Sequence, residues 1–229
     1  MALILQIDTS TPVCSAAVAA DGIVLASASV NEGYKHAENI VSLCLNVLRD
    51  AKKQKQQLDA IAVSCGPGSY TGLRIGVSTA KGLCYGLDIP LIAVSTLQMM
   101  AEQFYVSHPH FEGIAVPMID ARRMEVYTGM YDKAGTCVMA DRAFIVNEQT
   151  LEAPDKQTML AFFGDGAAKC RDILEASFPQ SNFNLVATPD ACGLSLSAHR
   201  AFEQKQFADL AYFEPEYLKP YQGTPPTKS

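Results

Sequence analysis

The sequence is short of charge and lacks the signatures of several common protein classes. Charged residues make up only 18% of its 229 residues, and 24 acidic side chains outnumber 18 basic ones, for a formal net charge of −6. Such a chain does not attract nucleic-acid phosphates over a broad surface. We therefore expect negligible nucleic-acid affinity from this chain alone.

Membrane, export and disulfide signals are also missing. No apolar run approaches the roughly 18 residues of a membrane span, and the apolar residues 2–7 are too few for a secretory signal. The seven cysteines are odd in number and include no C-x-x-C pair. These features predict a cytoplasmic protein with reduced thiols in its core.

The usual motifs of nucleotide hydrolysis, proteolysis and zinc binding are absent as well. No Gly-Lys-Ser/Thr follows the glycine-rich residues 66–72, so they do not form a Walker A loop. Ser69 lacks the flanking glycines of a nucleophile elbow, and there is no H-E-x-x-H or serine-protease triad. His36 opens a predicted helix, but Ile40 stands one turn later, where a second metal-binding histidine would be needed.

What the sequence does contain is a strand, a glycine turn and a helix over residues 58–87. Residues 58–64 are apolar and β-branched, which predicts a buried strand. Gly66 and Gly68 flank a proline and end the strand, and Ser69 or Thr71 can cap the following helix. That helix keeps several glycines, although each costs roughly 1 kcal/mol in a helix interior. We therefore expect neighbours to approach it closely on more than one side.

The two halves of the chain resemble each other. Each half reads as a three-stranded meander, a helix, a strand and then another helix, with a glycine turn before the last helix, which suggests a duplicated unit. The prediction is two α/β lobes, residues 1–106 and 107–221, that enclose a cleft, with a disordered tail at 222–229. The predicted strands are 2–7, 14–20, 23–30, 58–64, 91–94, 114–119, 125–131, 136–145 and 159–163. The predicted helices are 36–51, 71–87, 95–106, 167–176 and 193–204.

The turns at the strand ends are candidates for a vestigial nucleotide cleft, in which an aspartate holds a metal–phosphate group and small residues let the backbone approach. Against this, Asp120 is followed by alanine, two arginines and methionine rather than by glycine. Capping and turn roles left over from a duplication remain the alternative. The candidate residues are Asp8, Thr9, Ser10, Gly66, Gly68, Asp120, Gly164 and Gly166.

The helix at 36–51 is apolar over about 200° of its circumference, whereas a helix on one sheet needs an apolar stripe of only roughly 100°. Neighbouring helices of the same lobe or a partner protein would account for the surplus. We predict a partner surface on this helix and the helix at 71–87. The residues expected there are His36, Ile40, Leu43, Val47, Arg74, Val77, Lys81 and Tyr85.

Four motifs give the chain a family resemblance: IDTST at 7–11, GPGSYTGLRIG at 66–76, IDARRMEVY at 119–127 and PEYLK at 215–219. In this order they resemble the bacterial YeaZ (TsaB) family, over nearly the whole chain. The resemblance implies a duplicated actin-like (ribonuclease H-like) α/β fold. It also implies a role in making threonylcarbamoyladenosine next to the tRNA anticodon. Lys219 stands where this family often has arginine.

The resemblance further implies that the chain is a non-catalytic relative of the transferase TsaD, with no cofactor of its own. It would form a heterodimer with TsaD, to which the ATPase TsaE is added, and would meet tRNA, ATP or ADP and a metal ion only in that complex. Alone, it would pair as a homodimer through the same surface. The histidine pair that holds the metal in TsaD is reduced here to His36 and Ile40. The alternatives are an ATP-dependent small-molecule kinase of the same fold and a glycoprotease-like peptidase.

Overall fold

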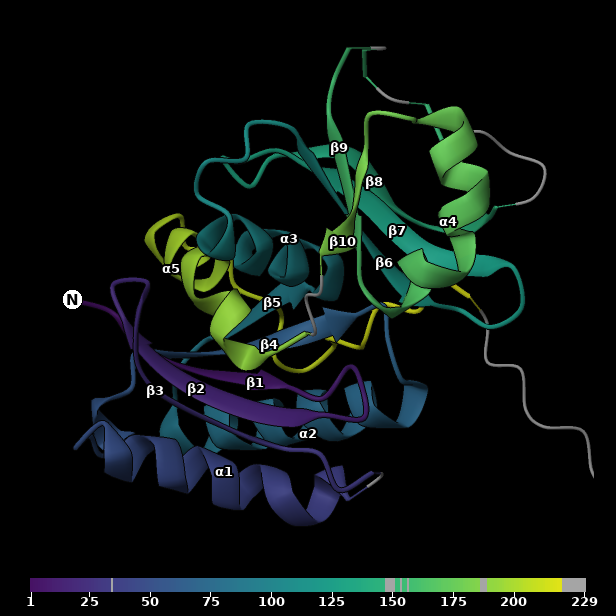
Figure 1. The fold of residues 1–229 in the computed structure, drawn as a ribbon. Coiled ribbons are helices and arrows are strands. Elements are labelled where there is room, and N and C mark those ends of the chain that lie inside the picture. The colour runs from purple at the N-terminus through teal and green to yellow at the C-terminus, as the bar shows by residue number, and fades with distance from the viewer. Residues whose placement is uncertain (34, 147–150, 153, 156, 186–188, 220–229) are drawn as a thin grey trace, which may run out of the picture.

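The computed structural model describes residues 1–33, 35–146, 151–152, 154–155, 157–185 and 189–219. Two five-stranded sheets form two lobes, with helix α3 between them (Figure 1). The first lobe consists of β1 (Leu3–Asp8), β2 (Cys14–Ala20), β3 (Ile23–Val30), α1 (His36–Asp50), a short 3₁₀ helix (Lys55–Gln57), β4 (Ala60–Gly66), α2 (Tyr70–Leu87), β5 (Leu91–Ser95) and α3 (Thr96–Ser107).

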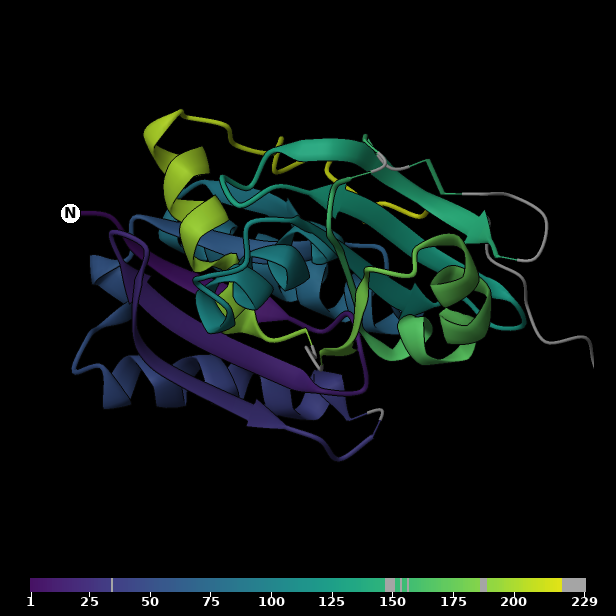
Figure 2. The same ribbon diagram turned by 45° about the horizontal axis from the view of Figure 1, so that its top comes forward.

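The second lobe repeats this plan. It consists of β6 (Ile114–Asp120), β7 (Glu125–Tyr131), β8 (Cys137–Ile145), β9 (Leu160–Phe163), α4 (Asp165–Ser177) and β10 (Asn182–Leu185). The chain then returns to the first lobe through the 3₁₀ helix η2 (Ala191–Leu194) and α5 (Ser195–Glu203). Figure 2 shows α5 beside α3.

Both sheets have the same topology, which confirms the predicted duplication. The strand order is β3-β2-β1-β4-β5 in the first sheet and β8-β7-β6-β9-β10 in the second. In each sheet the first three strands pair antiparallel and the last two add on in parallel. Strand β10 was not predicted. The described residues between β8 and β9 form no helix, so no counterpart of α1 is seen there.

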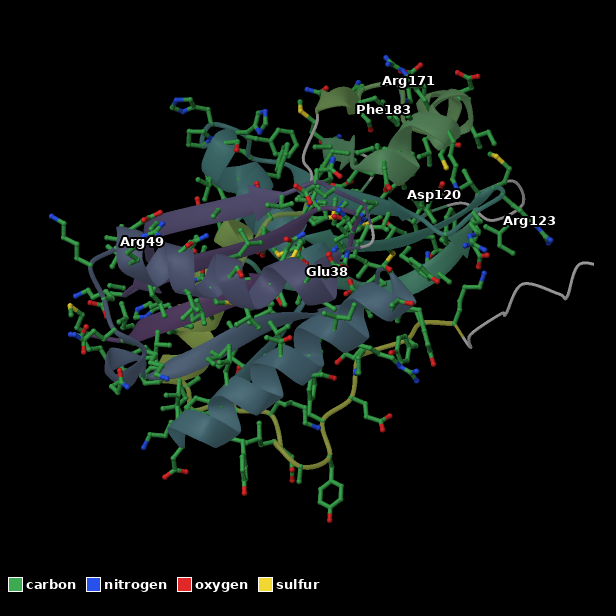
Figure 3. All side chains as sticks on the ribbon, turned by 90° about the horizontal axis from the view of Figure 1, so that it is seen from below. Glu38, Arg49, Asp120, Arg123, Arg171 and Phe183 are labelled. Carbon is green, nitrogen blue, oxygen red and sulfur yellow. The ribbon has the colours of Figure 1, made fainter. Side chains whose placement is uncertain are left out.

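The central strand β1 is buried on both faces, which explains its unbroken apolar run. Leu5 and Ile7 pack with α1 and α2 on one face, whereas Ile4 packs on the other face with the layer that contains α3 and α5. Because both faces are covered, the outer sides of α1 and α2 form one surface of the molecule. Figure 3 looks onto that surface, with Glu38 and Arg49 near the two ends of α1.

All seven cysteines are free thiols. Five are buried, as expected, whereas Cys137 is exposed and Cys192 half-buried. No helix in the described part of the chain is long and apolar enough to cross a membrane.

Candidate functional site

A cleft of about 470 Å³ lies between the two lobes. Its wall is formed by the β1–β2 turn, the glycine turn before α2, the β6–β7 turn and part of the C-terminal segment, defined here as residues 207–219. The lining residues are Ser10, Thr11, Pro12, His36, Pro67, Gly68, Ser69, Tyr70, Thr71, Ile119, Asp120, Ala121, Arg122, Tyr127, Asp165, Glu216, Tyr217, Leu218 and Lys219.

Only three of the eight residues proposed for a nucleotide cleft line this space: Ser10, Gly68 and Asp120. The other five lie behind its wall, where they serve the packing of the lobes. The sequence predicted that these turns lie together at a cleft. It did not show which of their residues face the cleft and which lie beneath it.

The β1–β2 turn and the start of α2 are in close backbone contact. The Ser69 amide donates to the Ser10 carbonyl over 2.7 Å, and the Thr9 hydroxyl donates to the Gly72 carbonyl over 2.7 Å. A Cβ at Gly72 would overlap the Thr9 carbonyl oxygen, and one at Gly76 the Thr9 hydroxyl. Gly72 and Gly76 therefore admit the neighbouring turn, as the sequence predicted, whereas nothing lies within 4 Å of a Cβ at Gly82 or Gly86. Of the two predicted caps, Ser69 is the one that accepts from Gly72.

Asp8 is fully buried beneath the cleft. Its Oδ1 accepts hydrogen bonds from the Ser64 hydroxyl and from the Ser10 amide. Burial raises the pKa of the Asp8 carboxyl above its ordinary value, although these hydrogen bonds oppose the shift. Asp8 does not line the cleft, so as placed its carboxylate does not fit the role of holding a metal–nucleotide there.

The corresponding turn of the second lobe is occupied by basic groups. The Lys169 ammonium pairs with the Asp120 carboxylate and also donates to the Arg123 and Glu125 carbonyl oxygens. Burial would raise the pKa of Asp120, but the hydrogen bond and charge of Lys169 hold it below its ordinary value. Arg122 lines the cleft. The turn therefore carries basic side chains where a phosphate-binding turn would have glycine.

The remaining glycines allow close packing. A Cβ at Gly66 would overlap the Glu216 carbonyl oxygen, and one at Gly164 the Met118 carbonyl oxygen. Both have positive φ, at 128° and 99°. A Cβ at Gly166 would lie 2.9 Å from the carbonyl carbon of Ile119. A structural role for these glycines was the alternative to a nucleotide cleft that the sequence left open.

The C-terminal segment passes along α2 and ends at the second lobe (Figure 3). The Glu216 amide donates to the Cys65 carbonyl over 2.8 Å, and the Tyr217 ring stacks on Tyr70 at 4.5 Å. Arg74 lies over the Tyr70 ring and donates to the Tyr217 hydroxyl over 3.2 Å. These contacts explain the PEYLK motif, because the sequence alone did not show what its proline and its tyrosine contact.

His36 is buried and its Nε2 lies 2.8 Å from the Thr11 carbonyl oxygen. Ile40 is 1% exposed and belongs to the core of the first lobe. Among the described residues, no group of three or more His, Cys, Asp or Glu side chains is arranged to hold a metal ion.

The placement of α1 corrects part of the predicted partner surface. Ile40, Leu43 and Val47 are at most 5% exposed and pack inside the first lobe. The apolar arc of α1 is wider than the stripe that packs on its sheet. Ile40, Leu43 and Val47 lie in the part of this arc that faces the sheet. The apolar side chains that α1 leaves on the surface are Val41, 49% exposed, and Leu45, 57% exposed.

The placement of α2 requires a similar correction. Val77 is 3% exposed and lies in the core. Arg74 contacts Tyr217, and the Lys81 ammonium donates to the Ala211 and Phe213 carbonyl oxygens over 3.2 and 2.9 Å. The chain's own C-terminal segment therefore occupies this row of α2. Of the four, Arg74 and Tyr85 remain exposed, Tyr85 at 84%.

The outer side of α2 is nevertheless open. A Cβ at Gly82 or Gly86 would meet no atom within 4 Å, and Ser78 is exposed on the same side. Since α1 and α2 contact each other, this open strip of α2 and the exposed Val41 and Leu45 of α1 lie on neighbouring helices. We call these five residues the helix face.

The chain is similar to known proteins over most of its length. A family described as "tRNA N6-adenosine threonylcarbamoyltransferase" matches residues 24–224. The Bacillus subtilis protein named "tRNA threonylcarbamoyladenosine biosynthesis protein TsaB" is 32% identical over 219 residues, which cover 94% of this chain and 93% of the relative. The Haemophilus influenzae protein of the same name is 30% identical over 227 residues, with 94% and 93% covered.

The chain belongs to the TsaB (YeaZ) family. The structure described as "YeaZ from Pseudomonas aeruginosa" has a TM-score of 0.76 at 28% identity, and the match covers 95% of this chain and 100% of that one. A second Pseudomonas aeruginosa protein, described as similar to peptidase YEAZ, has a TM-score of 0.81 at 27% identity, with 96% and 100% covered.

A more distant likeness concerns the fold alone. The Acidaminococcus fermentans (R)-2-hydroxyglutaryl-CoA dehydratase component A has a TM-score of 0.52 at 11% identity, with 87% of this chain and 98% of that chain covered. Together with the repeated sheet topology, this places the TsaB family chain in the duplicated actin-like fold that its motifs implied.

Proposed function

We propose that this chain takes part in tRNA threonylcarbamoyladenosine biosynthesis as a non-catalytic subunit that binds and activates the transferase TsaD in the cytoplasm. The observation that carries the proposal is the helix face, which the described segments of the chain leave uncovered. TsaE would join the pair, and tRNA, nucleotide and metal would be bound by the complex rather than by this chain alone.

The chemistry of the helix face suits a partner made of helices. Val41 and Leu45 lie one turn apart on α1, so their apolar side chains form a short ridge. Gly82 and Gly86 are also one turn apart and leave a shallow groove on α2. A ridge on one helix packs into such a groove on another. Two helices from each partner would then form a four-helix bundle.

The same face supports self-pairing when TsaD is missing. In a two-fold dimer each copy uses the same patch, so the ridge of one copy meets the groove of the other. Binding to TsaD and homodimer formation would therefore compete for one surface. Adding purified TsaD should convert the homodimer into a heterodimer.

The cleft supports a non-catalytic role. Asp8 is fully buried. Lys169 and Arg122 lie at the turn where a phosphate-binding glycine turn would be needed. These features disfavour the kinase alternative, and the missing protease motifs disfavour a peptidase. ATP hydrolysis by the isolated chain that Asp8→Ala abolishes would overturn the first conclusion, and digestion of casein by the isolated chain the second.

Charge insertion tests the helix face. Val41→Glu and Leu45→Glu should each abolish binding to TsaD, because an unpaired charge in an apolar interface costs several kcal/mol. Both side chains are already half exposed, so the monomer should stay folded. Ile173→Glu, at a 39% exposed position on α4, is the matched control and should bind normally.

A second pair of variants separates the effect of Gly82 on the stability of α2 from its effect on the close approach of a partner helix. Gly82→Ala should stabilise the monomer by about 1 kcal/mol, because alanine is the better helix former. Gly82→Gln should also leave the monomer folded but hold a partner helix away. Binding to TsaD is measured by light scattering and pull-down, and folding by circular dichroism. Wild-type affinity in Val41→Glu, Leu45→Glu and Gly82→Gln would place the interface elsewhere.

A further inference from the structure

One carboxyl group of the second lobe is bound by hydroxyl groups from both lobes. Asp141 lies on β8, and its Oδ1 accepts a hydrogen bond from the hydroxyl of Tyr131, which ends β7. Its Oδ2 accepts from the hydroxyl of Ser95, which ends β5 in the first lobe. We call Ser95, Tyr131 and Asp141 the interlobe joint.

The interlobe joint lies where the chain passes from the first sheet into α3. Ser95 is the N-cap of this helix, and its hydroxyl oxygen accepts from the Leu97 and Gln98 amides over 3.1 and 3.3 Å. Helix α3 lies between the two sheets and packs against strands of both (Figure 1). A change at Asp141 therefore reaches the first turn of a helix that the two lobes share.

The surroundings of the interlobe joint hold the Asp141 carboxyl group close to its partners. Tyr131 is 3% exposed, whereas Ser95 and Asp141 are half-buried. A Cβ at Gly129 on β7 would overlap Asp141 Oδ1. Glycine weakens a strand interior and often marks a close approach of this kind. Any side chain at this position would push the carboxyl group away from its present place.

The charge of an ionised Asp141 is poorly balanced. Among the described residues Asp141 forms no ion pair. The titratable groups that interact with its charge are Tyr131 on β7, Cys137 on β8, Cys65 on β4 and Glu216 of the C-terminal segment. None of these four is basic. The N-terminus of α3 contributes at most roughly half a positive charge.

The hydrogen bonds of the interlobe joint can form in either protonation state of Asp141. A tyrosine hydroxyl donates or accepts, so a neutral Asp141 can donate to the Tyr131 oxygen and still accept from Ser95. An ionised Asp141 accepts both hydrogen bonds but leaves an unpaired charge in a half-buried place, which costs free energy. Burial therefore raises the pKa of the Asp141 carboxyl above its ordinary value, although the hydrogen bonds from Ser95 and Tyr131 oppose the shift.

We propose that the interlobe joint is a proton-sensitive contact, which holds the two lobes together while Asp141 is neutral and loosens when Asp141 is ionised. In the ionised joint the charge draws water between β8 and the end of β5, and Ser95 caps α3 less firmly. The stabilisation by Asp141 is full below its unfolded pKa of about 4 and is lost as the pH rises through the higher folded value. The proposal is independent of the role with TsaD.

Hydrogen–deuterium exchange of the full-length chain, read by mass spectrometry, tests the proposal. The peptides that contain Leu97 and Gln98 report on the cap, because first-turn amides have no acceptor within their own helix. Rates are corrected for the intrinsic effect of pH and divided by those of α4 peptides, which report general changes in stability. Between about pH 5 and about pH 8 the wild type should lose protection at these amides by about threefold or more.

Variants then assign the effect to Asp141. Asp141→Asn stays neutral, and its amide can still donate to Tyr131 and accept from Ser95, so protection should persist at both pH values. Tyr131→Phe removes a hydrogen bond that favours the ionised carboxyl group, so protection should be lost at a higher pH than in the wild type. Glu203→Gln, at an exposed position at the end of α5, is the control and should respond like the wild type. Circular dichroism checks that each variant is folded.

Three results would overturn the proposal. The first is wild-type protection at Leu97 and Gln98 that does not change with pH relative to α4. The second is an Asp141→Asn variant that responds to pH like the wild type or is unprotected at both pH values, which would mean that the charged carboxylate holds the joint. The third is a Tyr131→Phe variant that loses protection at the same pH as the wild type or at a lower one.

Discussion

The Lys219 ammonium pairs with the Glu125 carboxylate across the two lobes. Lys219 follows Glu216 and Tyr217, which are fixed to the first lobe by the Cys65 carbonyl and by the Tyr70 ring. Glu125 begins β7 in the second lobe. The C-terminal segment therefore ties the second lobe to the N-terminal end of α2, beside the cleft.

Removing this ion pair should destabilise the protein. Lys219→Met keeps the length of the side chain but removes its charge, and the side chains of Lys219 and Glu125 are only 27% and 19% exposed. We expect a loss of about 1–2 kcal/mol in the free energy of unfolding, between the values for exposed and buried pairs. Urea denaturation measures it.

The control is Lys35→Met, which breaks the exposed pair of Lys35 with Glu32. That change should cost less than about 0.5 kcal/mol. Equal effects of the two substitutions would show that Lys219 does not tie the lobes together.

Asp8 should give the protein a characteristic pH dependence. Because burial raises its pKa in the folded state, the unfolded chain loses this proton first as the pH rises. Its contribution to stability is full below the unfolded pKa of about 4 and is lost as the pH rises through the higher folded value. Asp8→Asn should therefore gain stability relative to the wild type between pH 4 and neutral pH, as measured by urea denaturation.

Asp120 provides a control of opposite sign. Its pKa is lowered in the folded state, with Lys169 the main partner, so its stabilisation is present at neutral pH and is lost as the pH falls through that lowered value. Asp120→Asn should thus be less stable than the wild type at neutral pH, and the gap should close under acid. A stability difference for Asp8→Asn that does not change with pH would contradict the burial argument.

The strain at Arg123 should be measurable as stability. Arg123→Gly relieves a backbone with φ of 53°, and we expect a gain of up to about 1 kcal/mol after the extra freedom of glycine in the unfolded chain is subtracted. Arg123→Ala removes the same side chain without relieving the strain and should give no such gain. Thermal and urea denaturation compare the two, and an equal gain in both would attribute the effect to the side chain.

Local structure was largely predictable because its causes are local. Residues 58–87 form a strand, a glycine turn and a helix with Ser69 as its cap, since glycine, proline and a capping hydroxyl act on the backbone next to them. The duplication was also visible, because the same elements recur in both halves. Strand β10, Asn182–Leu185, was missed because two of its four residues are asparagine, a residue depleted in strands, whereas the equally short β9 is wholly apolar.

The sequence by itself determined the repeated α/β unit, the glycine-lined helix α2 and the turns that meet at the cleft, because hydrophobic periodicity and backbone restrictions specify them. It assigned residues 107–221 to the second lobe, whereas η2 and α5 pack on the first. Only the tertiary structure decided which apolar half of α1 faces its sheet. It buried Ile40, Leu43 and Val47 and left Val41 and Leu45 outside. It also placed the C-terminal segment against α2. Both outcomes depend on contacts between residues far apart in the chain, which composition and spacing do not encode.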